Sequence, residues 1–423
     1  MPTVTHLEAL EILDSRGGPT LEVSCVLDGG VRGNAAVPVA GTPGRAEVFY
    51  LRDEDPARHR GAGLRKAVAL VEGEIRAALT GKRFVDQVAF DRALRTLDGT
   101  DRLSRLGGNT VCGISLAFAR AQATAQGTPL FRHFAEMVGK GPHRLPLPIV
   151  SLFTGDGTDA TDRGPLGLAF LPAAATTVEE ALALSAHLST TAETTARGRY
   201  DIGVAMAHDG GIRAPFFDTD SMLDLAVKVV RAAQLEPERD VRLVLLGGAS
   251  RRFERGWYRI DREKLTPKEV IDHFATWTRR HPVYAVEDPL AEDDWESWAS
   301  LCTRLKEADR QVKVAGDDLL CSNPERIKRA VVQQASNALV LKPSQCGTLS
   351  DAAEALKLAR QADWTVIVAG RTGETEDDWL TDLAVGWGAD HLQIGGIRRS
   401  ERLAKYNRLL AIEKKTHWPL HRL

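Results

Sequence analysis

A chain of 423 residues is longer than one small domain and indicates either two domains or a barrel with an attached domain. Its hydrophobic content of 43% and charged content of 26% are ordinary for a globular protein, and its formal charge of −2 provides no field that attracts nucleic acid or anionic membranes. No apolar run approaches the roughly 20 residues that a membrane helix needs. We therefore expect small-molecule ligands, with neither nucleic acid nor membrane as a partner.

Cysteine usage and the first residues of the chain both favour a protein of the reducing cytoplasm. The five cysteines are scattered, odd in number and without the spacing of metal ligands. Glu8, Glu11 and Asp14 lie near the N-terminus and argue against a signal peptide. We expect a cytoplasmic protein.

The beginning of the chain predicts a small α+β domain. Apolar and polar side chains alternate over residues 21–27 and are interrupted by Asp28-Gly29-Gly30, which predicts a hairpin. Residues 31–37 form a third strand candidate, and a loop rich in glycine and proline follows at 39–44. From about residue 62 to 138 the apolar residues recur at helical spacing. Strands followed by helices are typical of an α+β domain.

From about residue 145 onward, short β-rich runs alternate with amphipathic helices. A spacing of roughly 25–30 residues between these runs is typical of βα units that close into a barrel. The clearest strand candidates are residues 283–286, 312–315, 338–341 and 365–368, and the helical stretches between them include 324–335 and 350–362.

Polar side chains stand at the ends of these four strands. They are Glu287, Asp317 and Lys342, with Arg371 just beyond Val368. Reactive side chains of such barrels lie at the C-terminal ends of the strands. These four residues are therefore the first candidates for a functional site.

Ordered motifs along nearly the whole chain resemble the enolase family. This resemblance implies an α/β, enolase-like fold, with an N-terminal α+β capping domain over residues 1–140 and a modified (β/α)8 TIM barrel over residues 141–423. The segments that carry the resemblance are residues 11–23, 97–100, 106–117, 287–298, 316–319, 339–350, 373–377 and 399–407.

The family's reaction removes a proton alpha to a carboxylate, and the resulting dianion needs a divalent metal and cationic side chains beside it. Two of the three carboxylates that hold Mg²⁺ in the family correspond to Glu287 and Asp317, and oxygen ligands suit this hard cation. The third position is Gly247. Lys342 matches the catalytic base. It acts either as a base with a depressed pKa or as a counter-ion for phosphate or carboxylate.

The residues that correspond to the family's acid depart most from its pattern. Asp209 stands in place of a glutamate, and the position of that glutamate's partner is Gly167. A loop histidine of the family falls at Thr158 or Asp159. His208 neighbours Asp209, and it either substitutes for the missing acid or is structural.

The positions that correspond to phosphate contacts are better retained. Arg371 offers a guanidinium that can bind phosphate through two hydrogen bonds, and Thr372 replaces a serine. Thr42 aligns with the serine that ligates a second magnesium when its loop closes. Gln393 replaces the family's second active-site lysine, which removes a positive charge near the substrate carboxylate. Arg45 is either an added anion contact or a solvated surface residue.

Three polar groups of the family's site are replaced by glycine in this chain, at Gly167, Gly247 and Gly370. Repeated replacement by the smallest residue predicts extra volume around a retained phosphate-and-base core. Such volume would accommodate a second, larger reactant. Glycine also meets demands of the backbone.

The retained and missing groups favour an enzyme that binds 2-phosphoglycerate or phosphoenolpyruvate with Mg²⁺ and joins it to an activated phosphonate. This pattern resembles the enolase-like carboxyphosphonoenolpyruvate synthases of phosphinothricin-type antibiotic pathways, whose second reactant is CMP-phosphonoformate. The missing carboxylate, lysine and acid partner disfavour an ordinary phosphopyruvate hydratase. The joint retention of Lys342, Glu287, Asp317 and Arg371 disfavours a non-catalytic paralogue. The resemblance also implies a homo-oligomer, a dimer or higher, with residues 11–20 in the interface region.

Overall fold

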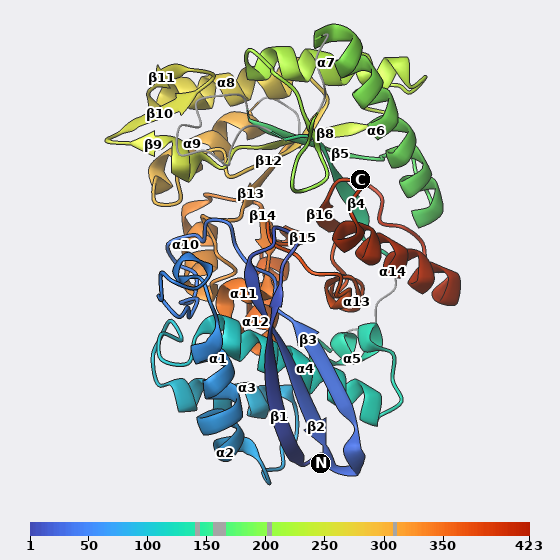
Figure 1. Cartoon of the computed structure of the whole chain (residues 1–423). Helices are drawn as coiled ribbons and strands as arrows, with labels where there is room; N and C mark the ends of the chain where they lie inside the picture. Colours follow the sequence, from blue (N-terminus) through green and yellow to red (C-terminus); the bar gives the residue numbers. More distant parts are fainter. Residues whose placement is uncertain (140–143, 155–165, 201–204, 308–310) are drawn as a thin grey trace.

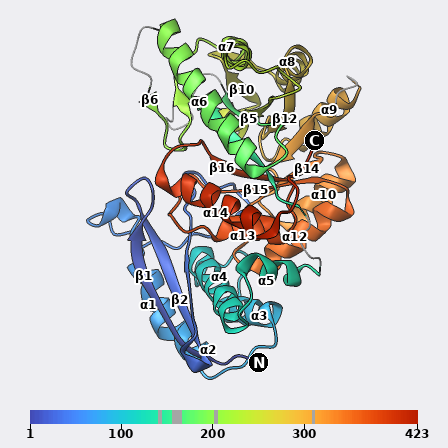
Figure 2. The same ribbon diagram turned by 90° about the vertical axis from the view of Figure 1, so that its right-hand side faces the viewer.

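The computed structural model describes residues 1–139, 144–154, 166–200, 205–307 and 311–423. A three-stranded sheet and its helices form the N-terminal part, and a barrel surrounded by helices follows it (Figure 1). In the view of Figure 2 the barrel stands above the N-terminal sheet and helices. No helix of the described residues is long and apolar enough to cross a membrane.

The N-terminal sheet is antiparallel, in the order β1 (Val4–Leu13), β2 (Pro19–Leu27) and β3 (Arg32–Ala36). A turn at Asp28–Gly30 joins β2 to β3, and both of its glycines have positive φ, which glycine adopts without steric cost. The hairpin predicted from the sequence is therefore confirmed. The helices that follow are α1 (Arg65–Leu70), α2 (Arg76–Leu79), α3 (Gln87–Asp98), α4 (Gly108–Ala125) and α5 (Leu130–Met137).

Helix α4 packs against β2 and β3, and most of its residues are buried. The close approach needs small residues, because a Cβ at Gly113 would lie 2.7 Å from a methyl of Val23. Phe118 of α4 stacks on Phe90 of α3 with ring centroids 3.8 Å apart. These contacts form the core of the N-terminal part.

Eight strands form the closed barrel, because β16 pairs with β4. Strand β5 runs antiparallel to both of its neighbours, β4 and β8, whereas the other described pairings of these eight strands are parallel. The four strands predicted from the sequence are present as β12 to β15. The barrel strands are β4 (Leu147–Phe153), β5 (Gly167–Leu171), β8 (Arg242–Leu246), β12 (Val283–Glu287), β13 (Lys313–Gly316), β14 (Ala338–Leu341), β15 (Thr365–Ala369) and β16 (His391–Gly395).

Helices cover the outside of the barrel, and two small β elements accompany it. The helices are α6 (Val178–Tyr200), α7 (Thr219–Ala232), α8 (Pro267–Arg280), α9 (Trp295–Lys306), α10 (Pro324–Gln333), α11 (Pro343–Cys346), α12 (Leu349–Gln361), α13 (Trp379–Gly386) and α14 (Ser400–Thr416). The small elements are the hairpin β6 (Ala205–Met206) and β7 (Ile212–Arg213), and the sheet of β9 (Phe253–Glu254), β10 (Trp257–Ile260) and β11 (Glu263–Leu265).

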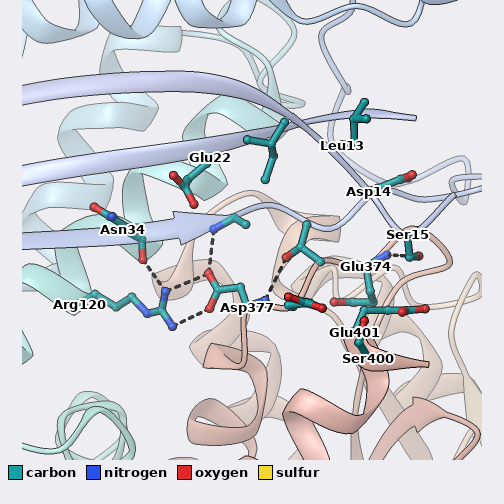
Figure 3. A pocket seen from close by; sticks show the side chains of 14 residues that line it. Leu13, Asp14, Ser15, Glu22, Asn34, Arg120, Glu374, Asp377, Ser400 and Glu401 are labelled. Carbon is teal, nitrogen blue, oxygen red and sulfur yellow. Dashed lines mark hydrogen bonds and ion pairs between the residues drawn. The ribbon is translucent and has the colours of Figure 1, made fainter. Parts of the chain in front are cut away.

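The two parts of the chain are joined by paired polar contacts. Arg120 of α4 donates hydrogen bonds of 2.9 and 2.6 Å to the carboxylate of Asp377, as Figure 3 shows. The backbone of Val39 exchanges hydrogen bonds of 2.7 and 2.9 Å with Gly373. The loop at residues 39–44 is thereby held beside the barrel residues that follow β15.

The C-terminal segment after α14 pairs with the residues before β4. The amide of Leu145 donates to the carbonyl of Pro419, and the amide of His421 donates to the carbonyl of Leu145, both at 2.8 Å. Trp418 packs edge-on against Phe131 with centroids 5.6 Å apart, and Leu420 is buried. The sequence did not reveal this role of the tail.

Candidate active site

A cavity of about 440 Å³ lies at the C-terminal ends of the barrel strands, where the loop after β3 meets the barrel. Seven of the nine predicted site residues line it: Thr42, His208, Glu287, Asp317, Lys342, Arg371 and Thr372. The other two contact its wall, because Asp209 accepts a hydrogen bond from Thr154 and Gln393 donates one to Glu287. Thr158 and Asp159 lie outside the described residues. The fold thus brings together residues that are up to 351 positions apart in the chain, from Thr42 to Gln393.

Four carboxylates lie together at the ends of β12 and β13. Burial and the neighbouring charge of Asp317 raise the pKa of Glu287 to about 7. The same two causes raise the pKa of Asp318 to about 7. Asp288 accepts hydrogen bonds from the amides of Asp317 and Asp318, at 3.0 and 2.8 Å. Asp288 therefore fixes the backbone of the turn after β13. The side chains of Asp317 and Asp318 both extend from this turn.

This group of carboxylates fits a hard divalent cation. Carboxylate oxygens of Asp288, Asp317 and Asp318 lie within 4.8 Å of one another. Both oxygens of Asp288 accept backbone amides, and both oxygens of Asp317 accept side-chain hydrogen bonds, so a cation at this group would share or displace existing contacts. A bound cation would also offset the mutual repulsion that raises the pKa of Glu287 and Asp318. Asp318 offers a further carboxylate beside Asp317.

Lys342 follows β14 and points to this acidic group. Its ammonium forms an ion pair with Oδ2 of Asp317, while Oδ1 of Asp317 accepts a 2.8 Å hydrogen bond from Gln345. Burial is the largest influence on the pKa of Lys342 and lowers it, but the charges of Asp317 and Glu287 and the hydrogen bond to Asp317 together outweigh burial, so the pKa is raised. Of the two interpretations of Lys342, this direction favours the counter-ion, because the lysine is a buried cation. Burial likewise raises the pKa of Asp317, and Lys342 and Arg371 hold it below its usual range.

Gln393 extends from β16 to the other side of Glu287. Its Nε2 donates a 2.8 Å hydrogen bond to Oε2 of Glu287. Its buried Oε1 has no hydrogen-bond partner among the described residues. The hydrogen bond from Gln393 lowers the pKa of Glu287, but burial and the charge of Asp317 outweigh it.

Arg371 follows β15 at the cavity wall and is almost completely buried. Its Nη2 donates hydrogen bonds of 2.9 and 2.7 Å to the two oxygens of Glu47, and both side chains are 6% exposed. Glu47 also accepts the amide of Gly44 at 3.0 Å. The pair thus connects the loop after β3 to the end of β15, and it holds the guanidinium at the cavity wall.

The loop at residues 39–44 is tied to the barrel by further contacts. The amide of Gly41 donates a 2.8 Å hydrogen bond to Oγ1 of Thr372. This bond holds the loop beside the end of β15, and Thr42 and Thr372 both line the cavity. Arg45 forms ion pairs with Glu292 and Asp293 and is 78% exposed. Of the two interpretations of Arg45, the surface position is confirmed, and its pairing partners are carboxylates of the barrel.

His208 and Asp209 lie in the turn between β6 and β7. Oδ1 of Asp209 accepts hydrogen bonds from Thr154 at 2.8 Å and from the amide of Gly211 at 3.0 Å. His208 lines the cavity, and burial lowers its pKa despite the opposing charge of Asp209. A neutral imidazole therefore faces the cavity, whereas the Asp209 carboxylate is engaged in the wall.

The three glycines do not all provide space. A Cβ at Gly247 would lie 2.3 Å from the carbonyl oxygen of Asp288, so its absence is a backbone requirement. A Cβ at Gly370 would lie 2.9 Å from Oε1 of Glu374, whose carboxylate fills the space beside it. A Cβ at Gly167 would first meet the side chain of Leu246, at 3.2 Å. The prediction that all three glycines open volume is wrong for Gly247 and Gly370, and at Gly167 a Cβ would already be in tight contact with Leu246.

Several residues of the site were not predicted from the sequence. Asp288 and Asp318 directly follow the predicted ligands Glu287 and Asp317. Their position next to these ligands was a signal from which they could have been predicted. Glu47, Gln345 and Thr154 lie far from those motifs in the chain, and nothing in their local sequence marks them. Arg251 and Arg252 also line the cavity. Two adjacent arginines shortly after the apolar run at 243–246 would have been a usable signal.

Comparison with protein-family models agrees with this geometry. Residues 4–134 match the model described as the enolase N-terminal domain, and residues 142–417 match the enolase C-terminal TIM barrel domain. Enzymes of this family typically use Mg²⁺, which suits the carboxylate oxygens of Asp288, Asp317 and Asp318. Together the two matches cover most of the 423 residues. The chain belongs to the enolase family.

Proposed function

We propose that this enolase-family enzyme binds Mg²⁺ together with 2-phosphoglycerate or phosphoenolpyruvate and condenses it with CMP-phosphonoformate. The product would be carboxyphosphonoenolpyruvate, with release of CMP. The observation that carries the proposal is the composition of one cavity. It keeps Glu287, Asp317, Lys342 and Arg371. Gln393, which contacts its wall, and Gly247 stand where the family has a lysine and a carboxylate. These groups suit an anionic enolate and its phosphate, and among the described residues the positions of the family's acid glutamate and of its partner are Asp209 and Gly167.

The covalent change balances when phosphoenolpyruvate, CMP-phosphonoformate and water give carboxyphosphonoenolpyruvate, CMP and inorganic phosphate. The bond between the enol oxygen and its phosphoryl group breaks with the uptake of water. The enol oxygen then forms a bond to the phosphorus of phosphonoformate. The bond from that phosphorus to the CMP oxygen breaks, and CMP leaves with the electron pair. From 2-phosphoglycerate, loss of water supplies phosphoenolpyruvate first.

The residues of the chain have distinct roles in this proposal. Glu287, Asp317 and Asp318 would hold Mg²⁺, which when bound offsets the charge of the enolate and of the phosphorus oxygens. Arg371 and Thr372 would bind the phosphate of the first reactant. Lys342 is cationic beside Asp317, so it can stabilise the enolate oxygen. A cation held by Asp317 would weaken this ion pair and lower the pKa of Lys342 toward that of a base.

Phosphorus NMR of the purified protein tests this function. The protein is incubated with Mg²⁺, 2-phosphoglycerate or phosphoenolpyruvate, and CMP-phosphonoformate. A new phosphonate resonance together with CMP release is the expected result. Conversion of 2-phosphoglycerate to phosphoenolpyruvate without condensation would instead identify a phosphopyruvate hydratase. No conversion, with Mg²⁺-dependent binding of phosphoenolpyruvate retained, would favour a binding role.

We also propose that the protein is a homo-oligomer that associates through the groove at the end of β1 (Figure 3). The groove has a volume of about 550 Å³, and Leu13, Asp14 and Ser15 lie along it. Leu13 in this groove is 60% exposed. An exposed leucine beside an acidic groove supports a face that is covered by a second copy.

A further inference from the structure

The cavity wall after β8 carries two arginines to which no role has been assigned above. Arg251 and Arg252 belong to the 3-10 turn η4 (Ala249–Arg252), and both line the cavity. Arg252 is 5% exposed, whereas Arg251 is exposed at the rim. One guanidinium is thus built into the wall, and the other stands at the entrance.

Backbone contacts fix this turn to the strand that carries Glu287. The amide of Gly247 donates to the carbonyl of Glu287 at 2.7 Å, and the amide of Ala249 donates to the carbonyl of Asp288 at 3.1 Å. The hydroxyl of Ser250 accepts the amide of Glu292 at 3.0 Å. The two arginines therefore start from a rigid segment beside the carboxylates.

The strand order places these arginines across the carboxylates from the other cations. Around the barrel, β8 is followed by β12, β13, β14 and β15 (Figure 1). The side chains at those ends are, in the same order, the arginine pair, Glu287, Asp317, Lys342 and Arg371. The acidic group is thus flanked by positive charge on both sides.

Space is available on the arginine side. Gly248 lines the cavity, and within the described part of the chain no atom lies within 4 Å of the position that its Cβ would take. Two cationic flanks with one acidic group between them suit two anionic reactants held on either side of a divalent cation. A single phosphorylated three-carbon acid needs only one of the flanks.

We propose that Arg251 and Arg252 bind the nucleotide phosphate of the second reactant, the leaving group of the condensation. This inference rests on the proposed function and assigns residues to its second substrate. As the enol oxygen bonds to the phosphonate phosphorus, the phosphorus–oxygen bond to the nucleotide breaks. The departing phosphate gains negative charge, and the two guanidinium groups stabilise that charge.

Isothermal titration calorimetry with CMP tests the assignment. The wild-type protein, R251Q, R252Q and the double variant are each titrated with CMP and, separately, with 2-phosphoglycerate, in the presence of Mg²⁺. Arg255→Gln is the matched control, because Arg255 lies in the same segment but is 91% exposed. Each single variant should weaken CMP binding about tenfold or more, since a charge-assisted contact is lost. The affinity for 2-phosphoglycerate should stay within about twofold, and R255Q should change neither.

Three results would overturn the assignment: no CMP binding by the wild-type protein, undiminished CMP binding by the double variant, or an equal loss of affinity for 2-phosphoglycerate. Because Arg252 is buried, R251Q at the exposed position provides the test if R252Q fails to fold. Normal condensation kinetics in the R251Q and R252Q variants would refute the subsite while the proposed function stands. Arginine-dependent CMP binding without any condensation product would keep the subsite and refute the proposed reaction.

Discussion

Replacing Gly247 by alanine should destabilise the protein more than the small size of the change suggests. The added Cβ would lie 2.3 Å from the carbonyl oxygen of Asp288 and 3.0 Å from that of Glu287. Both atoms belong to backbone, so the end of β12 must move by about 1 Å or more to restore ordinary contact. Overpacking of this kind costs about 1–3 kcal/mol, and rigid backbone neighbours place Gly247→Ala at about 3 kcal/mol.

Urea unfolding followed by circular dichroism measures this loss. Gly167→Ala is the matched control, because its new Cβ would meet the Leu246 side chain at 3.2 Å, and a side chain can shift. We expect a change within about 1 kcal/mol for the control. Because Gly247→Ala displaces Glu287, it should also weaken Mg²⁺-dependent binding of phosphoenolpyruvate, measured by calorimetry.

An unfolding free energy of Gly247→Ala within about 0.5 kcal/mol of wild type would refute this reasoning. The same geometry bears on Gly247→Asp, which would restore the family's carboxylate. The Cβ of the new aspartate would overlap backbone atoms of residues 287–288. We therefore expect no gain of hydratase activity from this change alone. Such a gain would show that the chain around position 247 rearranges freely.

Four further predictions concern catalysis, stability and assembly. Lys342→Ala should lower turnover by about 10²–10⁴ in the phosphorus NMR assay, and unimpaired turnover would exclude its role in proton transfer or charge stabilisation. Glu47→Gln should cost about 3 kcal/mol in urea unfolding because it leaves a buried guanidinium without its anion, whereas Lys268→Met, in an exposed pair, should change little. Burial lowers the pKa of His421 to about 4, so the unfolded chain binds more protons below pH 6.5. The unfolding free energy should therefore fall between pH 6.5 and 4, and less steeply in His421→Gln; equal slopes would contradict this assignment. Leu13→Glu should shift the mass measured by light scattering from an oligomer toward one chain, and an unchanged oligomer would place the interface elsewhere.

Much of the fold was readable in the sequence because its signals are local. Alternation over residues 21–27 and the glycines of the turn fixed the first hairpin, since a positive φ favours glycine wherever it occurs. The strands that became β12 to β15 were readable as short apolar runs between helices. The antiparallel direction of β5 was not, because strand direction depends on the neighbours that a strand acquires in the folded barrel.

The sequence also named most of the site, because barrel strands direct their terminal side chains to a common mouth. Glu287, Asp317, Lys342 and Arg371 follow from strand ends alone, and the motifs extended the set to seven residues of the cavity wall.

Only the tertiary structure decided how these residues pair. Arg371 pairs with Glu47, 324 positions away in the chain. Lys342 pairs with Asp317, and the pKa of this lysine, which the sequence left open as a base or a counter-ion, is raised. The glycines show the same division. Their identity is a property of the sequence, but whether a missing side chain leaves space or backbone contact depends on which atoms lie beside it. At Gly247 that atom is the carbonyl oxygen of Asp288, brought there by the pairing of β8 with β12.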